Sequence, residues 1–251
     1  MPPGLPCARA MREAGEFLLL IINKNGYHYV LCVGRPASAS ASLSFPPAAG
    51  GDSTGNPRMS SVIDTTRTQD LKARTHATHD QLDQRIMANQ PFANRENYSR
   101  FLEAQYRFLR DADALYDNPE LAALFPDLAE RRRYHSIAAD LAYLGRPLPQ
   151  LQDAPISETL DVATAMGWLY VVEGSKLGAA ILYKLAGKLG LDEHCGARHL
   201  AGHPDGRARH WRAFTAVLDG LQLDEAAEAR VTAGAVAAFA CMNGHLDQVY
   251  A

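Results

Sequence analysis

The stretch GWLYVVEGSKLGAAILY, from Gly167 to Tyr183, decides the fold class of this 251-residue chain. It belongs to an apolar pattern that begins at Ser157 and runs to about Leu189, much longer than the roughly eight residues of a buried strand. Gly174 and Gly178 lie four residues apart within it, and each glycine inside a helix costs about 1 kcal/mol relative to alanine. Two reasons for these glycines stay open: a close helix–helix crossing, or backbone that approaches a flat ligand.

Helical patterns also flank this stretch on both sides. Leu71, Thr75, Thr78, Leu82 and Ile86 recur at steps of three and four residues, which predicts an amphipathic helix from about Thr65 onward. Further helices are predicted over residues 96–116 with Asn94 as N-cap, from Asn118-Pro119, and over residues 131–144, 211–221 and 224–250 with Asp224 as N-cap. The stretch 147–155 is predicted to be a loop. We therefore expect an all-α, single-domain helical bundle.

Residues 1–58 differ in composition from the rest of the chain. Clusters of Pro, Gly, Ser and Ala, such as residues 37–42 and 46–51, cannot bury enough apolar surface to offset their ordering entropy. Residues 18–33 are the exception, because they could form a short strand pair. We predict that 1–58 is a disordered extension, or one that an upstream translation start adds before Met59, and that 59–251 is the functional domain.

Composition and charge exclude several classes of protein. A net charge of -3 gives no basic face for nucleic acid, and no apolar run is long enough to cross a bilayer. The four cysteines are far apart and form no C-x-x-C pair, which is typical of a reduced chain. We expect a cytoplasmic protein without nucleic-acid or membrane partners.

His79 is the first candidate for chemistry. It lies beside the apolar row of its predicted helix, and Asp83 follows four residues later on the same face. That spacing suits a metal-bound imidazole whose second ring nitrogen donates to a carboxylate. A structural histidine beside an acid has the same spacing, so the pattern alone leaves both readings open.

Two polar segments favour a less specific interpretation. His194, His199, His203 and His210 resemble a zinc cluster, but the glycines and proline among them break any long helix and no cysteine pair assists. We predict a solvated basic turn there. Arg131–Arg133 is likewise predicted to be a solvated face, although these side chains could reach into a pocket.

From about Asp70 to Tyr250 the chain resembles bacterial haem oxygenases of Gram-negative type. The matching blocks occur in family order, and residues 1–58 have no counterpart among them. The blocks are THATHDQLD (75–83), QPF (90–92) with Asn97-Tyr98, GWLYVVEGSKLGAA (167–180), GARHL (196–200), HPDG (203–206) and HWRAF (210–214).

The resemblance implies that haem lies between a proximal helix and a kinked distal helix. It makes His79 the axial ligand of the haem iron, with Asp83 as the acidic partner that the family places four residues later. Gly174, Ser175 and Gly178 become the catalytic distal segment, where glycine backbone presses on bound O2. Haem is then both cofactor and substrate, and the products are biliverdin, CO and ferrous iron.

The resemblance also implies which residues hold the haem propionates. Lys72 and Tyr170 match the positions used in the form that cleaves at the α-meso carbon, and Lys176 is a third candidate. Arg133 and Gln105 match stretches that contribute to the distal polar network.

Partners follow from what the sequence lacks. There is no G-x-G-x-x-G loop for NADPH or flavin, so electrons are expected from a separate reductase or ferredoxin. We expect a monomer. Two rivals stay open: a haem carrier or sensor that uses His79 without degrading haem, and a cofactor-free thiaminase-like helical protein, which would need a nucleophile such as Cys195 or Cys241 in a pocket.

Overall fold

The chain divides into two units, Met1–Ser60 and Ser61–Ala251, close to the predicted boundary at residue 58. The structure is a computed structural model that describes residues 22–23, 26–27, 65–150, 156–204 and 206–251. Most of the segment predicted to be disordered lies outside these residues, so that prediction stands as it was made.

The first unit contributes one described element. Strands β1 (Ile22–Asn23) and β2 (Gly26–Tyr27) pair antiparallel, with Ile22 opposite Tyr27. This agrees with the predicted strand pair, and the rest of residues 18–33 lies outside the described residues.

The second unit is helical throughout its described part, which confirms the all-α prediction. Its elements are α1 (Arg67–Ala88), α2 (Arg95–Asp111), η1 (Asp113–Asp117), α3 (Pro119–Leu124), η2 (Ala129–Arg131), α4 (Tyr134–Tyr143), α5 (Val162–Gly187), η3 (Arg198–Leu200), α6 (Arg207–Gly220) and α7 (Glu225–Tyr250), where η marks a 3-10 helix. None of these helices is long and apolar enough to cross a membrane.

Side-chain caps fix where several helices begin. Asn94 accepts from the Asn97 amide at 2.8 Å, and Asp224 accepts from the Ala227 amide at 2.8 Å, so both predicted N-caps are confirmed. α5 begins five residues later than predicted, because Asp161 caps it by accepting from the Thr164 amide.

Three other predicted boundaries were wrong. The helix predicted to reach Tyr116 ends at Asp111 and continues as η1. The predicted helix 131–144 is divided into η2 and α4, because Arg132 has an extended backbone. α6 begins at Arg207, four residues early, after Gly206 turns the chain with φ 87°.

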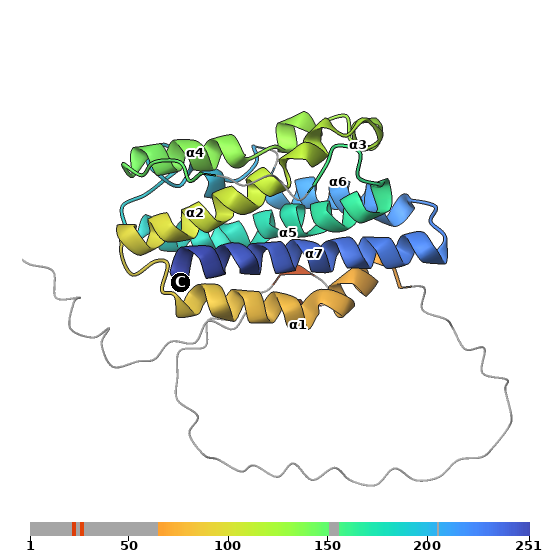
Figure 1. Cartoon of the computed structure of the whole chain (residues 1–251), viewed down its shortest axis with the longest axis horizontal. Coiled ribbons are helices and arrows are strands. Elements are labelled where there is room, and N and C mark those ends of the chain that lie inside the picture. The colour runs from red at the N-terminus through yellow and green to blue at the C-terminus, as the bar shows by residue number, and fades with distance from the viewer. Residues whose placement is uncertain (1–21, 24–25, 28–64, 151–155, 205) are drawn as a thin grey trace, which may run out of the picture. The chain divides into compact units, whose positions relative to one another are not determined.

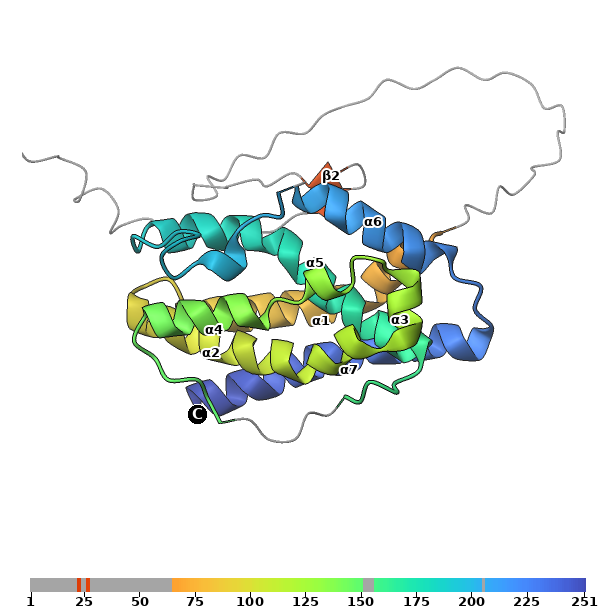
Figure 2. The same cartoon turned by 90° about the horizontal axis from the view of Figure 1, so that it is seen from above.

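α5 and α7 form the centre of the bundle, and two glycines let them cross closely. A Cβ on Gly167 would lie 2.0 Å from the Val231 carbonyl oxygen, and one on Gly234 would lie 2.2 Å from the Thr164 carbonyl oxygen. Figure 1 shows α7 between α1 and α2, and it packs against both. In Figure 2 the axis of α5 changes direction near mid-length, in line with the predicted kink.

Candidate functional site

α1 has a buried row and an adjacent exposed stripe. Leu71, Thr75 and Leu82 are buried, and the Thr75 hydroxyl donates to the Leu71 carbonyl oxygen at 2.7 Å. The stripe carries the exposed Lys72 and, seven residues on, His79. The chain therefore places the predicted ligand at the edge of the core.

His79 is held from two sides and is open on a third. Its Nδ1 lies 3.4 Å from Oδ2 of Asp83, and the ring packs edge-on against Phe239 of α7, with centroids 6.0 Å apart. Burial raises the pKa of the Asp83 carboxyl, and the neighbouring His79 lowers it. The side chain of His79 is 44% exposed, and Nε2 makes no hydrogen bond to any residue that the structure describes. The ring is thus positioned through Nδ1 and available through Nε2.

The glycines of α5 fall into two groups. Gly167 occupies the crossing with α7, whereas a Cβ added to Gly178 would meet no described atom within 4 Å. A Cβ on Gly174 would meet only the ring of Trp211, at 3.7 Å. Close packing explains Gly167 and does not explain Gly178, so the second reading, an open face for a ligand, fits Gly178 better, whereas the ring of Trp211 occupies the space beside Gly174.

Tyr170 shares that face, because it lies four residues before Gly174 on the same helix. Its ring is half-buried and packs against Trp211 of α6, with centroids 5.8 Å apart. Trp211 therefore backs the face formed by Tyr170, Gly174 and Gly178. Trp211 belongs to the family block at residues 210–214, but nothing in the sequence indicated that it contacts Tyr170.

Ser175 lies about 100° around α5 from Gly174, beside the open face and not within it. Its hydroxyl donates to the Val172 carbonyl oxygen at 2.7 Å, which occupies its proton. In this state Ser175 can accept a hydrogen bond but does not offer one.

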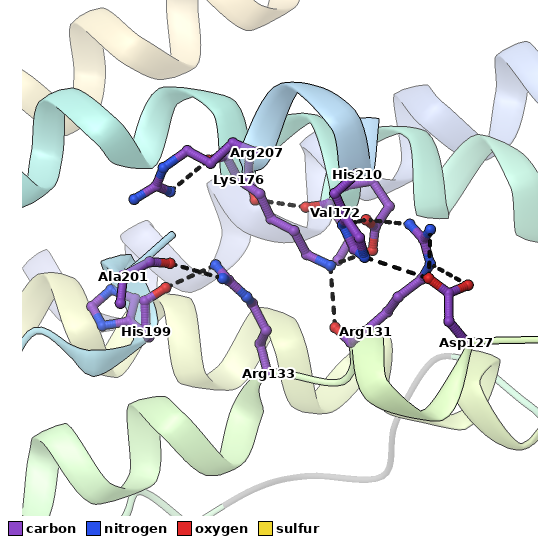
Figure 3. Close-up of polar contacts among 11 residues, drawn as sticks. Asp127, Arg131, Arg133, Val172, Lys176, His199, Ala201, Arg207 and His210 are labelled. Atoms are coloured by element: carbon purple, nitrogen blue, oxygen red, sulfur yellow. Dashed lines mark hydrogen bonds and ion pairs between the residues drawn. The ribbon is translucent and has the colours of Figure 1, made fainter. Parts of the chain in front are cut away.

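Lys176, the third candidate for the propionates, is buried, and protein groups engage its ammonium. Its ammonium donates to Oε1 of Glu173 at 2.5 Å and to the Arg131 carbonyl oxygen at 3.2 Å (Figure 3). Burial lowers the pKa of Lys176 to about 8, although Glu173 opposes this shift. Its partners tie α5 to η2, so the structure favours a structural role.

Glu173 of α5 contacts several basic side chains. Besides Lys176 it accepts from Nη1 of Arg131 at 2.9 Å, and Nδ1 of His210 lies 3.5 Å from its Oε2. Arg131 reaches Asp127 as well, with Nη2 2.9 Å from Oδ2. The side chains of Arg131 and Glu173 are 2% and 1% exposed, so the prediction that this arginine is solvated was wrong.

A cavity of about 210 Å³ lies beside this network. Its lining has more cationic than anionic side chains, with Arg131–Arg133, Lys176 and Arg207 against Glu130 and Glu173. The alternative that the arginines reach into a pocket is the one that the structure supports.

The histidine-rich segment is a solvated turn only in part, because His194 is exposed and His199 is not. His199 is buried, and its Nδ1 lies 2.8 Å from Oδ2 of Asp140, which also accepts from the His199 amide. Arg133 donates to the carbonyl oxygens of His199 and Ala201 (Figure 3). These bonds fasten η3 to α4, and two residues that look like surface basic residues in the sequence, Arg133 and His199, supply them.

Within the described residues the four histidines also do not converge as the zinc cluster that their sequence resembles would require. His203 and His210 stack, with ring centroids 4.7 Å apart, but His199 faces Asp140 and does not join them. Gln105, expected near the distal network, has a buried Oε1 that no described residue contacts by a hydrogen bond.

The Heme oxygenase family model matches residues 65–247, nearly all of the second unit. The chain belongs to the haem oxygenase family. Heme oxygenase PigA of Pseudomonas aeruginosa is 45% identical over 185 residues, 74% of this chain and 93% of PigA. A heme oxygenase of Xanthomonas campestris is 31% identical over 147 residues, 58% of this chain and 86% of that protein.

Solved structures agree with this assignment. The crystal structure of the NO- and CO-bound heme oxygenase of Neisseria meningitidis matches with a TM-score of 0.69 and 42% identity, covering 74% of this chain and 92% of that one. The haem oxygenase fold, predicted from the motif blocks, is thereby confirmed.

The residues of this haem oxygenase fit haem on two observations. Gly178 has no side chain and the space in front of it is open, so a flat macrocycle can approach the α5 backbone there. His79 presents an uncommitted Nε2, and Asp83 lies beside its Nδ1. Residues that sequence reasoning missed are Glu173 and Asp140. The signal for Glu173 was a lone acid at a buried position of an apolar helix, three residues before a lysine.

Proposed function

We propose that this chain degrades haem, with O2 and externally supplied electrons, to biliverdin, CO and ferrous iron. The observation that carries the proposal is the open space into which a Cβ on Gly178 would project. At Gly167 of the same helix, the backbone of α7 occupies the corresponding space. Membership of the haem oxygenase family supports the reaction class.

His79 is proposed as the axial ligand of the haem iron through Nε2. Asp83, 3.4 Å from Nδ1, would hold the ring orientation and keep the proton on Nδ1. The edge contact with Phe239 restricts rotation of the same ring. When bound, haem supplies the iron at which O2 is activated and the ring that is opened.

The face of α5 is proposed to set which edge of haem reacts. Gly174 and Gly178 let the backbone lie close to the macrocycle and exclude bulk water from that side. The hydroxyl of Ser175, beside this face, donates its proton to the Val172 carbonyl oxygen, so its oxygen can accept a hydrogen bond from an ordered water. No distal acid–base histidine is needed in this arrangement.

Lys72 and Tyr170 are proposed to hold the propionates, one from α1 and one from α5. That placement would favour cleavage at the α-meso carbon. Lys176 takes no part in this proposal, because Glu173 and Arg131 engage its ammonium.

The remaining partners are proposed from the sequence and the thiols. Electrons would come from a separate reductase or ferredoxin. Cys195 and Cys241 are free thiols, which suits the reducing cytoplasm. We propose a cytoplasmic monomer, and two purposes of the reaction stay open, iron acquisition from haem and the supply of biliverdin to a phytochrome.

The test is to add one equivalent of haemin to the purified chain, then ascorbate or a reductase in air. A Soret band that bleaches while biliverdin absorption grows supports the enzyme, whereas a stable Soret band with every donor supports the haem carrier or sensor. Mainly α-biliverdin on HPLC supports the roles of Lys72 and Tyr170, and mainly β or δ isomer contradicts them.

A matched pair of variants isolates the ligand. His79→Ala is expected to lose ligation and turnover, and added imidazole should restore part of both. His76→Ala is the control, because Nδ1 of His76 also lies 3.4 Å from an aspartate, Asp80, while its side chain is 69% exposed. Equal turnover by the two variants would refute the assignment of His79.

A further inference from the structure

A cluster of three metal-binding side chains lies between α2 and α7, outside the haem site. It consists of Asp111, the last residue of α2, and Cys241 and His245, one turn apart on α7. Within the described residues this is the only group of three or more such side chains whose ligand atoms all lie within 4.8 Å of one another.

The three side chains converge through the atoms that would bind a metal. Sγ of Cys241 donates to Oδ2 of Asp111 at 3.2 Å, and Nε2 of His245 lies 2.6 Å from the same oxygen. Sγ and Nε2 are 3.6 Å apart. Since the i and i+4 positions of one helix share a face, the sequence of α7 fixes the thiol and the imidazole together.

These separations can be compared with those of a zinc site. Zn–S and Zn–N bonds of about 2.3 and 2.0 Å at the tetrahedral angle place sulfur and nitrogen about 3.5 Å apart. The observed 3.6 Å between Sγ and Nε2 matches that value without movement. The carboxylate must retreat from Nε2 by about 0.8 Å, since a zinc-bound nitrogen and oxygen lie about 3.4 Å apart. Rotation of the Asp111 side chain supplies such a shift.

The cluster is sheltered but reachable. The side chains of Asp111 and His245 are each 13% exposed, and Cys241 is half-buried. A bound Zn²⁺ ion needs no further anionic side chain, because the thiolate of Cys241 and the carboxylate of Asp111 together supply two negative charges. The ligand types, one sulfur, one nitrogen and one oxygen, suit zinc and not calcium or magnesium, which prefer oxygen.

The site is separate from His79. Phe239, which touches His79, lies two residues before Cys241 and so points about 200° away around α7. Asn243, on the side of Phe239, binds Arg85 of α1. α7 therefore presents one face to the haem-binding helix and another to Asp111.

We infer that Asp111, Cys241 and His245 form a three-ligand zinc site that fastens the C-terminal end of α2 to α7, with a fourth position left for water. The alternative is a metal-free hydrogen-bonded cluster. The zinc site and the metal-free cluster differ in whether a divalent metal ion replaces the hydrogen bonds among these three side chains.

The test titrates Zn²⁺ into the full, chelator-treated, reduced and haem-free chain against a chromophoric chelator. It then uses Co²⁺ as a spectroscopic probe. We expect one equivalent of Zn²⁺ to bind, a higher unfolding temperature with zinc, and a thiolate-to-cobalt charge-transfer band. Failure of haem turnover would leave all three readouts unaffected, so this proposal and the proposed function can fail separately.

Variants identify the ligands. Cys241→Ser and His245→Gln should each weaken Zn²⁺ binding at least tenfold, and Cys241→Ser should abolish the charge-transfer band. Cys195→Ser, a second half-buried thiol, and His79→Ala should leave both unchanged. Circular dichroism establishes that each variant is folded. No binding by the parent chain, or a band that survives in Cys241→Ser, would overturn the site.

Discussion

Glu173 shows how one carboxylate can organise several residues. It is 1% exposed and contacts Arg131, Lys176 and His210, so removing its charge would leave the buried ammonium of Lys176 without its carboxylate and Arg131 with Asp127 alone. We expect Glu173→Gln to lower the free energy of unfolding by about 3–5 kcal/mol, measured by urea denaturation at pH 7. The control is Asp247→Asn, which breaks an exposed pair with Arg85 and should cost less than about 1 kcal/mol. A loss for Glu173→Gln no larger than that of the control would contradict this account.

At the same scale, sequence reasoning succeeded where the signal was local. His79 and Asp83 could be paired because both lie on one helix at a fixed spacing. The partners of Lys176 could not be predicted in this way, since Arg131 lies 45 residues away in the sequence. The arginines of residues 131–133 look like surface residues until the fold brings Glu173 and the carbonyl oxygens of η3 to them.

At the scale of the helices, short-range features were again predicted and long-range contacts were not. Caps at Asn94 and Asp224 are short-range and were predicted correctly. The division of the predicted helix 131–144 was not, because it depends on the contacts of arginine side chains with α5 and η3. The crossing of α5 with α7 was also hidden, since Gly167 and Gly178 look equivalent in the sequence.

Two glycines of α5 should respond to alanine with opposite sign. Gly167→Ala places a methyl group 2.0 Å from a carbonyl oxygen of α7, and backbone cannot rotate away, so we expect a loss of at least about 1–3 kcal/mol in unfolding free energy. Gly178→Ala meets open space and should raise the stability of the haem-free chain by up to about 1 kcal/mol through helix propensity. Thermal unfolding of both haem-free variants tests the pair, and a large loss for Gly178→Ala would show that its surroundings are filled.

For the molecule as a whole, buried histidines should make the free energy of unfolding depend on pH. Burial and the neighbouring Arg131 lower the pKa of His210 to about 4, and burial lowers that of His199. The unfolded chain takes up protons near pH 6.5, where the folded chain does not. Stability is therefore fully present above about pH 6.5 and falls as the pH drops toward 4.

Urea midpoints at pH 7, 6 and 5 would measure this loss. We expect His210→Gln to reduce the slope, because glutamine takes up no proton in either state. His194→Gln is the control, since His194 lies on an exposed turn. Parallel pH profiles for the parent and His210→Gln would show that His210 does not contribute.

The division of the chain gives the last prediction. The core that positions α1 and α5 is built within Ser61–Ala251, and the family match begins at residue 65. A chain that starts at Met59 should therefore bind haem, degrade it and unfold at the same temperature as the full chain. A shorter chain that starts at Asn89 lacks α1 and His79, and it should lose haem ligation. Absorption spectroscopy with haemin and thermal unfolding compare the three chains. Loss of activity on removing residues 1–58 alone would assign that segment a role in the enzyme, which its composition does not predict.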